Sequence, residues 1–356
     1  MRAAVHVGQL LQPVPGGIGR YVRNLLASLP GAGVEAVPFA AGGPPEGVEG
    51  YVDLGWPVAP LRYELWHRLR HPRIRIPADV VHATSLAVPP SGRRPLVVTI
   101  HDLVFLRQPE HLTPRGVSFH RRGLALARRH ADAVVVPTAF GRNDLVSEGF
   151  EAERIHVAHH GVHLPADPDP ASTAAALERL GVATPFILFV ATIEPRKGVV
   201  DVVAAHRALR AARPDLGLVL AGPKGWGLAP DLRGPGLVIA GMVGDVELDA
   251  LYRSAVALAL PSRYEGFGLQ VVEAMARGCP VVTTDAACLP EIAGGAADLV
   301  PVGDVDALTD ALARLLDDDD HRSRRAAAGR ARAGDFSWEA SAASHAGAYR
   351  SAVASR

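Results

Sequence analysis

The chain has few cysteines and no long apolar run. Cys279 and Cys288 are its two cysteines, too few for a disulfide framework or a zinc site, and they fit a reducing compartment. No apolar stretch approaches the roughly 18 residues that a transmembrane helix needs. The first residues, Met1–Gly8, lack the apolar region of a signal peptide and are expected to form a first strand. We therefore expect a cytoplasmic protein.

The chain also lacks net charge, because 37 Lys and Arg residues balance 37 Asp and Glu residues. A neutral chain of this kind is not expected to bind nucleic acid. The charge is unevenly distributed, since residues 1–165 carry roughly +5 and the remainder roughly −5. Such an asymmetry can steer an anionic partner to one half of the molecule. Lysine is nearly absent, and Lys197 and Lys224 both stand in the second half.

Apolar runs alternate with amphipathic stretches, which is typical of α/β proteins with parallel sheets covered on both faces. At 356 residues the chain is long enough for two such domains. The predicted strands are Ala3–Val7, Val34–Phe39, Val80–Ala83, Leu96–Ile100, Ala133–Val136, Ile155–Ala158, Phe186–Val190, Gly217–Ala221, Leu237–Ala240, Val256–Leu260 and Pro280–Thr283. The predicted helices are Arg20–Leu29, Val117–Arg129, Val199–Ala212, Asp245–Arg253, Leu269–Arg277 and Val305–Leu316.

A segment rich in Pro and Asp, Leu164–Ala171, interrupts this alternation and is interpreted as a linker. It separates a first domain of residues 1–165 from a second domain of residues 166–336. A last segment comprises residues 337–356. The acidic run Asp317–Asp320 is interpreted as a solvated helix end and not as a metal site.

The most informative motif is Ser262-Arg-Tyr-Glu265-Gly-Phe-Gly-Leu-Gln-Val-Val-Glu273-Ala-Met-Ala-Arg-Gly278. It follows a predicted buried strand, so Glu265 is expected in the loop at the carboxyl end of that strand. Glu273 is expected just over one turn into the following helix, which Gly278 ends. The alternative is that Glu265 caps this helix and Glu273 is a solvated surface residue.

The start of the same helix offers backbone donors. The N–H groups of Phe267, Gly268 and Leu269 are expected to lack partners within the helix, at a point where the helix macrodipole supplies about half a positive charge. Phosphate or sugar hydroxyl groups can use such donors.

The wider string, Pro261-Ser262…Glu265-Gly-Phe-Gly-Leu…Glu273-Ala-Met-Ala…Gly278-Cys-Pro-Val-Val…Leu289-Pro-Glu291-Ile, resembles the retaining glycosyltransferases of family 4. That family has the GT-B fold, so the resemblance implies two Rossmann-like domains whose parallel sheets face each other across a cleft. It assigns the nucleotide-sugar donor to the second domain and the acceptor to the first. It also implies that the last helix crosses back to the N-terminal domain. By the same resemblance, the loop that binds the donor would include Gly266, directly after Glu265.

Two segments of the first half match the family pattern. Gly16-Gly17-Ile18-Gly19 precedes a predicted helix and lets the backbone approach a ligand without a Cβ in the way. The resemblance implies that this glycine loop contacts the donor phosphate. His101 follows the predicted strand Leu96–Ile100 and matches a family histidine that touches the transferred sugar near the reacting carbon. Asp102 is expected to orient the His101 ring. A structural role for His101 is the alternative.

The segment Thr192-Ile-Glu194-Pro-Arg196-Lys197-Gly198 places two cations before a predicted helix. Arg binds a pyrophosphate with two parallel hydrogen bonds, and Lys binds it as a compact charge. The family usually has an arginine at the position of Thr192. We expect Arg196 to supply the missing guanidinium group beside Lys197.

Two further loops follow predicted strands of the second half. Gly222-Pro-Lys224-Gly-Trp226-Gly could line the base or phosphate pocket, and a turn with a solvated lysine is the alternative. Gly241-Met-Val243-Gly-Asp245 resembles the base-binding loop of the family, in which backbone groups at Val243 would meet the base. Asp245 could equally be a helix N-cap.

Arginines with interleaved aromatic residues form two stretches, Arg62–Arg75 and Arg115–Arg129. Such charge runs are usually solvated faces. Both stretches fall in the expected acceptor half, however, and a basic amphipathic helix with aromatic residues can lie on an anionic membrane surface. Peripheral contact with the inner face of the cell membrane is therefore one expectation.

The sequence predicts a metal-independent, retaining glycosyltransferase that moves a hexose from a nucleotide sugar to a glycan or lipid-linked acceptor. Neither a metal nor another cofactor is expected, because Asp167-Pro-Asp169 lies in the linker and Asp304-Val-Asp306 is a predicted helix cap. Arg196, Lys197 and the backbone N–H of Gly17 would meet the charge of the leaving group. Glu265 would hold sugar hydroxyls, and Glu273 would accept from the ribose. No residue is an obvious covalent nucleophile.

Several alternatives stay open. The variant Glu194-Pro-Arg196-Lys197-Gly198 resembles the GDP-mannose-dependent branch of the family, which serves polysaccharide assembly, but a UDP-hexose is also possible. A nucleotide-sugar epimerase of the same fold would release an epimerised sugar without an acceptor. A nicotinamide-dependent enzyme is disfavoured, because Gly16–Gly19 lacks the full G-x-G-x-x-G fingerprint. A non-catalytic carbohydrate-binding protein would tolerate loss of Glu265.

Overall fold

The structure is a computed structural model that describes residues 1–165, 169–225 and 232–356. The chain divides into two compact units. Unit 1 comprises residues 1–161 together with 337–356, and unit 2 comprises residues 162–336. The boundary therefore precedes the predicted linker Leu164–Ala171, part of which lies outside the described residues, including Asp167. The last helix groups with unit 1.

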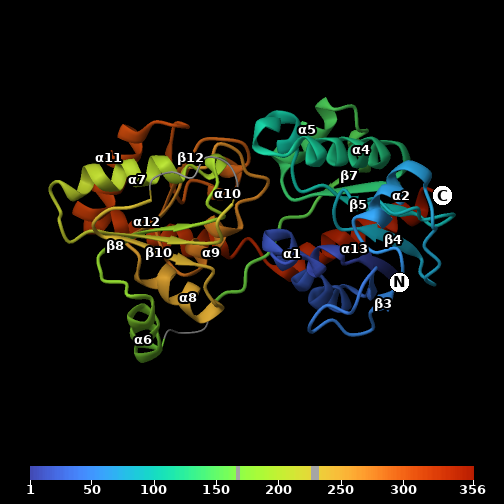
Figure 1. Cartoon of the computed structure of the whole chain (residues 1–356), viewed down its shortest axis with the longest axis horizontal. Coiled ribbons are helices and arrows are strands. Elements are labelled where there is room, and N and C mark those ends of the chain that lie inside the picture. The colour runs from blue at the N-terminus through green and yellow to red at the C-terminus, as the bar shows by residue number, and fades with distance from the viewer. Residues whose placement is uncertain (166–168, 226–231) are drawn as a thin grey trace. The chain divides into compact units, whose positions relative to one another are not determined.

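Unit 1 contains a seven-stranded parallel sheet in the order β3-β2-β1-β4-β5-β6-β7 (Figure 1). Its strands are β1 (Arg2–His6), β2 (Glu35–Ala40), β3 (Val52–Asp53), β4 (Val80–Ala83), β5 (Leu96–Thr99), β6 (Ala133–Val136) and β7 (Ile155–Val157). Because every pair is parallel, the carboxyl ends of all seven strands share one edge. His101 follows β5 at this edge.

Helices cover both faces of this sheet. They are α1 (Gly16–Ser28), α2 (Leu61–Leu69), α3 (Val104–Arg107), α4 (Pro114–His130), α5 (Ala139–Ser147) and α13 (Trp338–Ala354). On one face α1 and α13 lie side by side and share a core with Ala3 and Val5 of β1. On the other face α2, α4 and α5 pack with Ala4 of the same strand. This alternation of neighbouring residues between the faces is the two-residue period of a strand.

Unit 2 repeats the architecture with a six-stranded parallel sheet in the order β10-β9-β8-β11-β12-β13. Its strands are β8 (Phe186–Val190), β9 (Gly217–Ala221), β10 (Leu237–Gly241), β11 (Ala257–Leu260), β12 (Val281–Thr284) and β13 (Asp298–Val300). Phe186, Ile187 and Leu188 of β8 are fully buried, which explains why a continuous apolar run forms this central strand.

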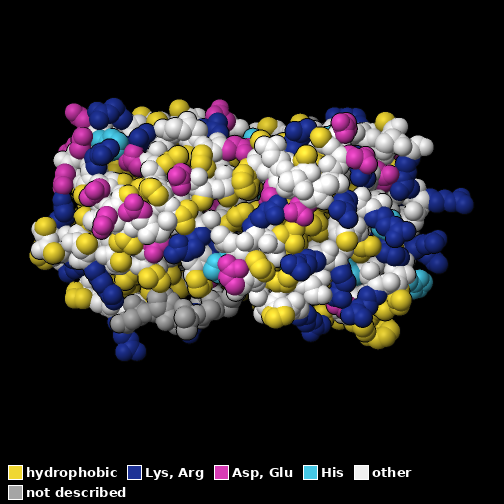
Figure 2. All heavy atoms as spheres, turned by 90° about the horizontal axis from the view of Figure 1, so that it is seen from above, with side chains coloured by type: hydrophobic (Ala, Val, Ile, Leu, Met, Phe, Trp, Pro, Cys, Tyr) yellow, Lys and Arg dark blue, Asp and Glu magenta, His cyan; other side chains and the backbone are white. Residues whose placement is uncertain are grey.

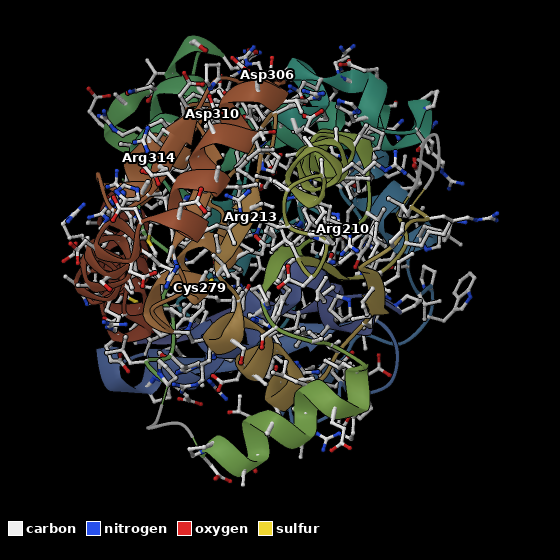
Figure 3. The ribbon with its side chains drawn as sticks, turned by 90° about the vertical axis from the view of Figure 1, so that its left-hand side faces the viewer. Arg210, Arg213, Cys279, Asp306, Asp310 and Arg314 are labelled. Carbon is white, nitrogen blue, oxygen red and sulfur yellow. The ribbon has the colours of Figure 1, made fainter. Side chains whose placement is uncertain are left out.

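The helices of unit 2 are α6 (Pro170–Leu180), α7 (Val199–Arg210), α8 (Asp245–Ser254), α9 (Leu269–Ala276), α10 (Leu289–Ala293), α11 (Val305–Asp317) and α12 (Asp319–Ala333). The amphipathic helix α11 buries Leu308 and Leu312, while Asp306 and Asp310, four residues apart, share another face (Figure 3). At the end of this helix Asp318 caps α12 by accepting from the backbone N–H of His321. The acidic run is thus a helix junction, as predicted.

The observed elements differ from the predicted ones in three ways. Helix α1 begins at Gly16, four residues before the predicted start, so the glycines form its first turn. The short strands β3 and β13 were not predicted, because two or three residues carry too little periodicity to detect. The helices α2, α3, α5, α6, α10 and α12 were also missed. In α12, for example, Gly329 and Ala333 are the buried residues, so no apolar stripe marks it.

Within the described part of the chain, no helix is both long enough and apolar enough to cross a membrane.

Candidate active site

The charged residues of unit 2 meet where the strand order of its sheet reverses. Strand β8 pairs with β9 on one side and with β11 on the other. Ligands of open parallel sheets bind at such a reversal, beyond the carboxyl ends of the strands. The loop after β8 carries Arg196 and Lys197, and the loop after β11 carries Glu265. The backbone N–H of Arg263 donates to the Arg196 carbonyl at 2.8 Å and joins the two loops.

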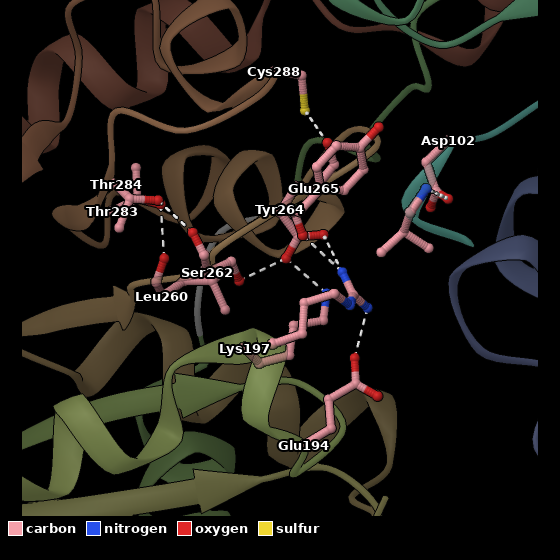
Figure 4. A network of polar contacts seen from close by, with 12 residues as sticks. Asp102, Glu194, Lys197, Leu260, Ser262, Tyr264, Glu265, Thr283, Thr284 and Cys288 are labelled. Carbon is pink, nitrogen blue, oxygen red and sulfur yellow. Dashed lines mark hydrogen bonds and ion pairs between the residues drawn. The ribbon is translucent and has the colours of Figure 1, made fainter. Parts of the chain in front are cut away.

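An ion pair between Lys197 and Glu265 lies at the centre of this site (Figure 4). Lys197 Nζ donates to Glu265 Oε1 at 2.6 Å, and Ser262 Oγ donates to the same oxygen at 2.7 Å. Both charged side chains are buried, with Glu265 5% and Lys197 7% exposed. A buried pair of this kind is strongly coupled, because removal of either partner leaves the other as an unpaired charge in the interior.

Arg196 bridges the two loops beside that pair. It donates to Glu194 Oε1 at 2.6 Å and to the Tyr264 carbonyl at 2.7 Å. Its guanidinium lies 3.8 Å from Glu265 Oε2, beyond hydrogen-bond distance. Arg196, Lys197, Glu194 and Glu265 together carry no net charge when all four are ionised. The cationic loop predicted from the sequence is therefore balanced by two carboxylates in the structure.

Glu265 is ionised in this arrangement. Burial alone would raise the pKa of its carboxyl group, but the charges of Lys197 and Arg196 and the hydrogen bonds from Lys197 and Ser262 outweigh burial. The pKa of Glu265 therefore lies below its usual value, and the group is an acceptor at neutral pH.

Two glycines permit the tight turns on which these side chains depend. Gly198 has a φ of +71°, and a Cβ there would lie 2.3 Å from the Pro261 carbonyl oxygen, so the β8 loop approaches the β11 loop closely only with glycine. Gly268 begins α9 with a φ of +86°. Strand β12 and the start of α10 support the β11 loop. Thr284 Oγ1 donates to the Ser262 carbonyl at 2.5 Å, and Cys288 Sγ contacts the Glu265 carbonyl at 3.1 Å.

Glu273 is buried, contrary to the alternative of a solvated surface residue. It is 7% exposed on α9, and the Tyr252 hydroxyl donates to Glu273 Oε2 at 3.2 Å. The Arg277 guanidinium lies 5.6 Å from the Tyr252 ring and donates to the Glu273 carbonyl at 3.2 Å. The sequence could not show this burial, because Tyr252 belongs to a different helix, α8.

The predicted donor-binding residues Gly266, Phe267, Gly268 and Leu269 form the turn from β11 into α9. Phe267 is buried, and its ring packs edge-on against Phe336 with 5.7 Å between ring centroids. Gly268 and Leu269 are buried too, so the first residues of α9 are fixed by packing.

Val243 lies in the loop between β10 and α8 and is half-buried. Strands β10, β9, β8 and β11 are consecutive in the sheet, so the loops carrying Val243, Lys224, Lys197 and Glu265 follow one another along one edge. Lys224 is exposed, in agreement with a solvated lysine. Trp226, in the same motif, lies outside the described residues.

In unit 1, Gly16 and Gly17 form the first turn of α1 and are exposed. Gly16 has a φ of +60°, and a Cβ built there meets no atom within 4 Å. This helix start has neither a side-chain cap nor an acidic residue in its first turn. Its first N–H groups are therefore not satisfied by a cap, as a backbone phosphate site requires.

His101 follows β5, and its Nε2 atom lies 2.9 Å from the Thr84 carbonyl oxygen. Because a carbonyl only accepts, Nε2 carries the proton. Burial lowers the pKa of His101, although the hydrogen bond to Thr84 and the charge of Asp102 oppose this shift. The neutral ring therefore has its acceptor at Nδ1. The hydrogen bond of the ring goes to Thr84, and Asp102 Oδ1 accepts from the backbone N–H of Val104, so Asp102 acts on His101 through its charge.

The structure therefore brings together Arg196, Lys197 and Glu265, whereas Glu273 has separate partners. Sequence reasoning missed Glu194 and Tyr252 as partners of predicted site residues. Glu194 stands two residues before Arg196, and this spacing could have suggested the pair. Across residues 1–165, 169–225 and 232–356, no group of three or more His, Cys, Asp or Glu side chains is arranged to hold a metal ion.

Two family models match the chain, one in each half. The model of Glycosyltransferase Family 4 matches residues 15–165, and the model of glycosyl transferases group 1 matches residues 176–332. The chain is 30% identical over 299 residues to O-antigen chain mannosyltransferase B of Escherichia coli, covering 79% of this chain and 77% of that protein. It is 32% identical over 310 residues to the MMP α-(1→4)-mannosyltransferase of Mycolicibacterium hassiacum, covering 78% of this chain and 71% of that protein.

A crystal structure of Anabaena HepE in complex with UDP-glucose matches with a TM-score of 0.75 at 19% identity, covering 98% of both chains. At this identity the likeness concerns the fold alone, and it confirms the predicted α/β class of two parallel-sheet domains in a GT-B protein. Two matching family models and relatives aligned over most of their length show that this chain is an enzyme and belongs to the family 4 glycosyltransferases.

Proposed function

We propose that this glycosyltransferase moves mannose from GDP-mannose to a glycan or lipid-linked acceptor, without a metal and with retention of the anomeric configuration. The observation that carries the proposal is the buried Lys197–Glu265 pair, with Arg196 beside it, at the strand-order reversal of unit 2. Mannose as the sugar is supported by the Glu194-Pro-Arg196-Lys197-Gly198 variant. It is supported further by the two mannosyltransferases among the relatives.

Glu265 is the proposed acceptor for sugar hydroxyls. Its Oε1 is engaged by Lys197 and Ser262, whereas Oε2 is 3.8 Å from Arg196. A sugar hydroxyl can therefore donate to Oε2 without breaking the ion pair. Lys197 and Arg196 then act on the pyrophosphate, together with the N–H groups at the starts of the helices. Such fixed charges act strongly where water is excluded.

The unit 1 residues have complementary proposed roles. The N–H groups at Gly16 and Gly17 would bind the donor phosphate, and Nδ1 of His101 would accept from a hydroxyl of the transferred sugar. In unit 2, backbone groups at Val243 and those from Gly266 to Leu269 are proposed to bind the donor as well.

Thermal unfolding with added nucleotide sugars tests the donor. A ligand at about one hundred times its dissociation constant stabilises the folded state by about 2.7 kcal/mol. We expect GDP-mannose to raise the unfolding temperature and UDP-glucose to leave it nearly unchanged. A rise in unfolding temperature with UDP-glucose and none with GDP-mannose would establish the alternative of a UDP-hexose donor. The similar HepE structure contains UDP-glucose, which is the reason for including this sugar in the test.

Replacement of Glu273 with Gln should weaken GDP-mannose binding by about tenfold, since a hydrogen bond to a charged acceptor is worth about 1.5–3 kcal/mol. Gln keeps an acceptor for the Tyr252 hydroxyl, so the fold should be preserved. Ala would remove this acceptor of the Tyr252 hydroxyl and would confound the result. Calorimetric titration measures the affinity, and an unchanged value would remove Glu273 from the donor site.

Transfer should survive EDTA, because the proposed site meets the pyrophosphate with Lys197, Arg196 and backbone N–H groups. The rate of GDP release, measured before and after dialysis of the protein against EDTA, shows whether activity depends on a metal. If the chelator abolishes activity and Mg²⁺ or Mn²⁺ restores it, the proposed pyrophosphate site is contradicted.

Peripheral membrane contact is the proposed means of reaching a lipid-linked acceptor. Arg121, Arg128 and Arg129 of α4 are exposed, whereas Arg122 pairs with Glu64 at 3.0 Å and is less available. Dark blue Lys and Arg side chains are frequent on the face of unit 1 that Figure 2 shows. Each basic residue near an anionic surface contributes about 1 kcal/mol, within a Debye length of about 8 Å.

Vesicle sedimentation tests this contact. Binding should require acidic lipid, fall as salt rises, and weaken strongly when Arg121, Arg128 and Arg129 are replaced together with Gln. The control replaces three exposed arginines of unit 2, Arg207, Arg324 and Arg330, with Gln and should bind normally. Equal binding to neutral and acidic vesicles, or binding to neither, would favour a soluble acceptor and would show that these arginines form a solvated face.

A further inference from the structure

Five buried side chains of unit 1 are joined by consecutive hydrogen bonds next to His101. Tyr349 Oη lies 2.8 Å from His82 Nδ1, and His82 Nε2 lies 2.8 Å from Thr99 Oγ1. Thr99 Oγ1 lies 2.9 Å from Tyr21 Oη, which lies 2.8 Å from His345 Nε2. All five residues are at most 1% exposed. They come from α1, β4, β5 and α13, so the chain of hydrogen bonds ties four elements together.

One end of this chain fixes the direction of every hydrogen bond in it. His345 Nδ1 lies 2.8 Å from the Ser341 carbonyl oxygen, so Nδ1 donates and Nε2 of the neutral ring accepts. The Tyr21 hydroxyl must then donate to His345, and it accepts from Thr99. Thr99 in turn accepts from His82 Nε2, and His82 Nδ1 accepts from Tyr349. Each hydroxyl has one defined donor role, so the position of Tyr21 is strongly specified.

Tyr21 is also the member of the chain whose ring packs against His101. The two ring centroids are 5.0 Å apart in an edge-to-face arrangement. The His160 ring packs against both, with its centroid 4.8 Å from that of Tyr21 and 5.6 Å from that of His101. His101 is therefore held at Nε2 by Thr84 and on its side by the Tyr21 ring. Tyr21 itself belongs to α1, whose first turn contains Gly16 and Gly17.

We propose that Tyr21 is a positioning residue: anchored by Thr99 and His345, it fixes the ring of His101 so that Nδ1 faces the substrate. This inference rests on the proposed role of His101. His82 and Tyr349, at the far end of the series of hydrogen bonds, are not part of this proposal. A ring held by a single hydrogen bond can rotate, and a misplacement of about 1 Å can cost about a hundredfold in rate.

The first arm of the test reads the His101 ring without any substrate. In protein labelled at the histidine side chains, the His101→Ala variant identifies the NMR signals of His101, which should show the Nε2–H tautomer. Tyr21→Phe should move these signals toward tautomer-averaged values. Tyr349→Phe, which also deletes one buried hydroxyl of the chain, should leave them unchanged. Equal shifts in both variants, or in neither, would overturn the proposal. If Tyr21→Phe does not fold, Thr99→Val removes the same anchor.

The second arm uses release of GDP from GDP-mannose, with water as the acceptor. Tyr21→Phe should lower kcat about tenfold with little change in KM. In the His101→Ala background the same substitution should have no further effect, because Tyr21 acts through His101. An equal tenfold loss in both backgrounds would indicate a merely structural role. If His101→Ala alone leaves kcat unchanged, the proposed role of His101 fails, while the NMR arm still decides whether Tyr21 fixes its ring.

Discussion

Replacement of Lys197 with Ala lowers nucleotide-sugar turnover by about one to three orders of magnitude, the scale for removing one electrostatic stabiliser of a transition state. Lys197 is the buried cation closest to Glu265, at 2.6 Å. Its loss would remove a proposed phosphate ligand and would leave Glu265 without this ion-pair partner. Measurement of kcat for GDP release tests this. Lys224→Ala, which removes the other, exposed lysine, is the matched control and should change kcat by no more than about threefold.

A double variant separates this chemistry from folding. Lys197→Met alone leaves the buried Glu265 carboxylate without its closest cation and should lower the free energy of unfolding by about 3 kcal/mol. Addition of Glu265→Gln removes that charge and should restore much of the stability, but turnover should stay low. Recovery of turnover in the double variant would show that the pair is structural.

Arg196→Ala should reduce turnover at least as much as Lys197→Ala, because Arg196 bridges Glu194 to Tyr264 and is also the proposed guanidinium ligand of the phosphate. Arg196→Lys keeps the charge but cannot make both hydrogen bonds in the same geometry, and it should recover only part of the activity. A mild effect of Arg196→Ala beside a severe effect of Lys197→Ala would remove the idea that Arg196 replaces the family arginine.

Unit 1 should lose stability as the pH falls from about 6.5 toward 4, because it buries several neutral histidines. Burial lowers the pKa of His345 to about 4 and that of His6 to about 3, and it lowers the pKa of His82 well below 6.5. As the pH falls, these histidines take up protons in the unfolded chain before they do so in the folded protein. Their contribution to stability is therefore complete above about pH 6.5 and is lost as the pH falls from there toward the pKa of the folded state. Each such histidine contributes about 1.4 kcal/mol per pH unit.

With several histidines acting together, the loss approaches the whole stability of a typical domain, about 5–15 kcal/mol. We expect unit 1 to unfold near pH 5. In unit 2, among the residues described, His206 is the one histidine whose pKa is lowered. Hydrogen exchange measured by mass spectrometry resolves the two units, and unit 2 should remain protected at a lower pH. Equal protection of both units down to pH 4 would contradict this expectation.

His6 provides a sharp variant for the same experiment. Neither ring nitrogen has a hydrogen-bond partner among the described residues, and the ring lies among Phe39, Tyr63 and Trp66. His6→Phe therefore removes a titrating group without breaking a hydrogen bond. The pH dependence of unfolding should become shallower by about 1.4 kcal/mol per pH unit. An unchanged slope would show that His6 does not contribute to the acid sensitivity.

The sequence predicted the central elements well because they carry strong local signals. Strand β8 is a continuous apolar run, and Phe186–Val190 was predicted with the observed bounds. Glu265 and Lys197 were placed in loops after strands, which the structure confirms. Their ion pair was not predictable, since 68 residues separate them and only the order of the strands brings β8 beside β11.

The same reason explains what was missed in unit 1. Tyr21 occupies a buried position of an amphipathic helix, and such spacing predicts a core residue and nothing more. Its partner His345 is 324 residues away in the sequence, on the last helix of the chain, α13. The predicted start of α1 is wrong because glycine lowers helix propensity, whereas the observed helix begins at Gly16.

Calorimetric titration of GDP-mannose into the wild-type protein and into Lys197→Met tests the central claim most directly, because it measures donor binding at the Lys197–Glu265 site without an acceptor. Lys197→Met removes the charge but keeps a side chain of similar length, and circular dichroism confirms that the variant is folded. We predict binding of one GDP-mannose per chain to the wild type and at least about tenfold weaker binding to Lys197→Met, as expected for loss of a charge-assisted contact. Equal affinity for both proteins would contradict the assignment of the donor site.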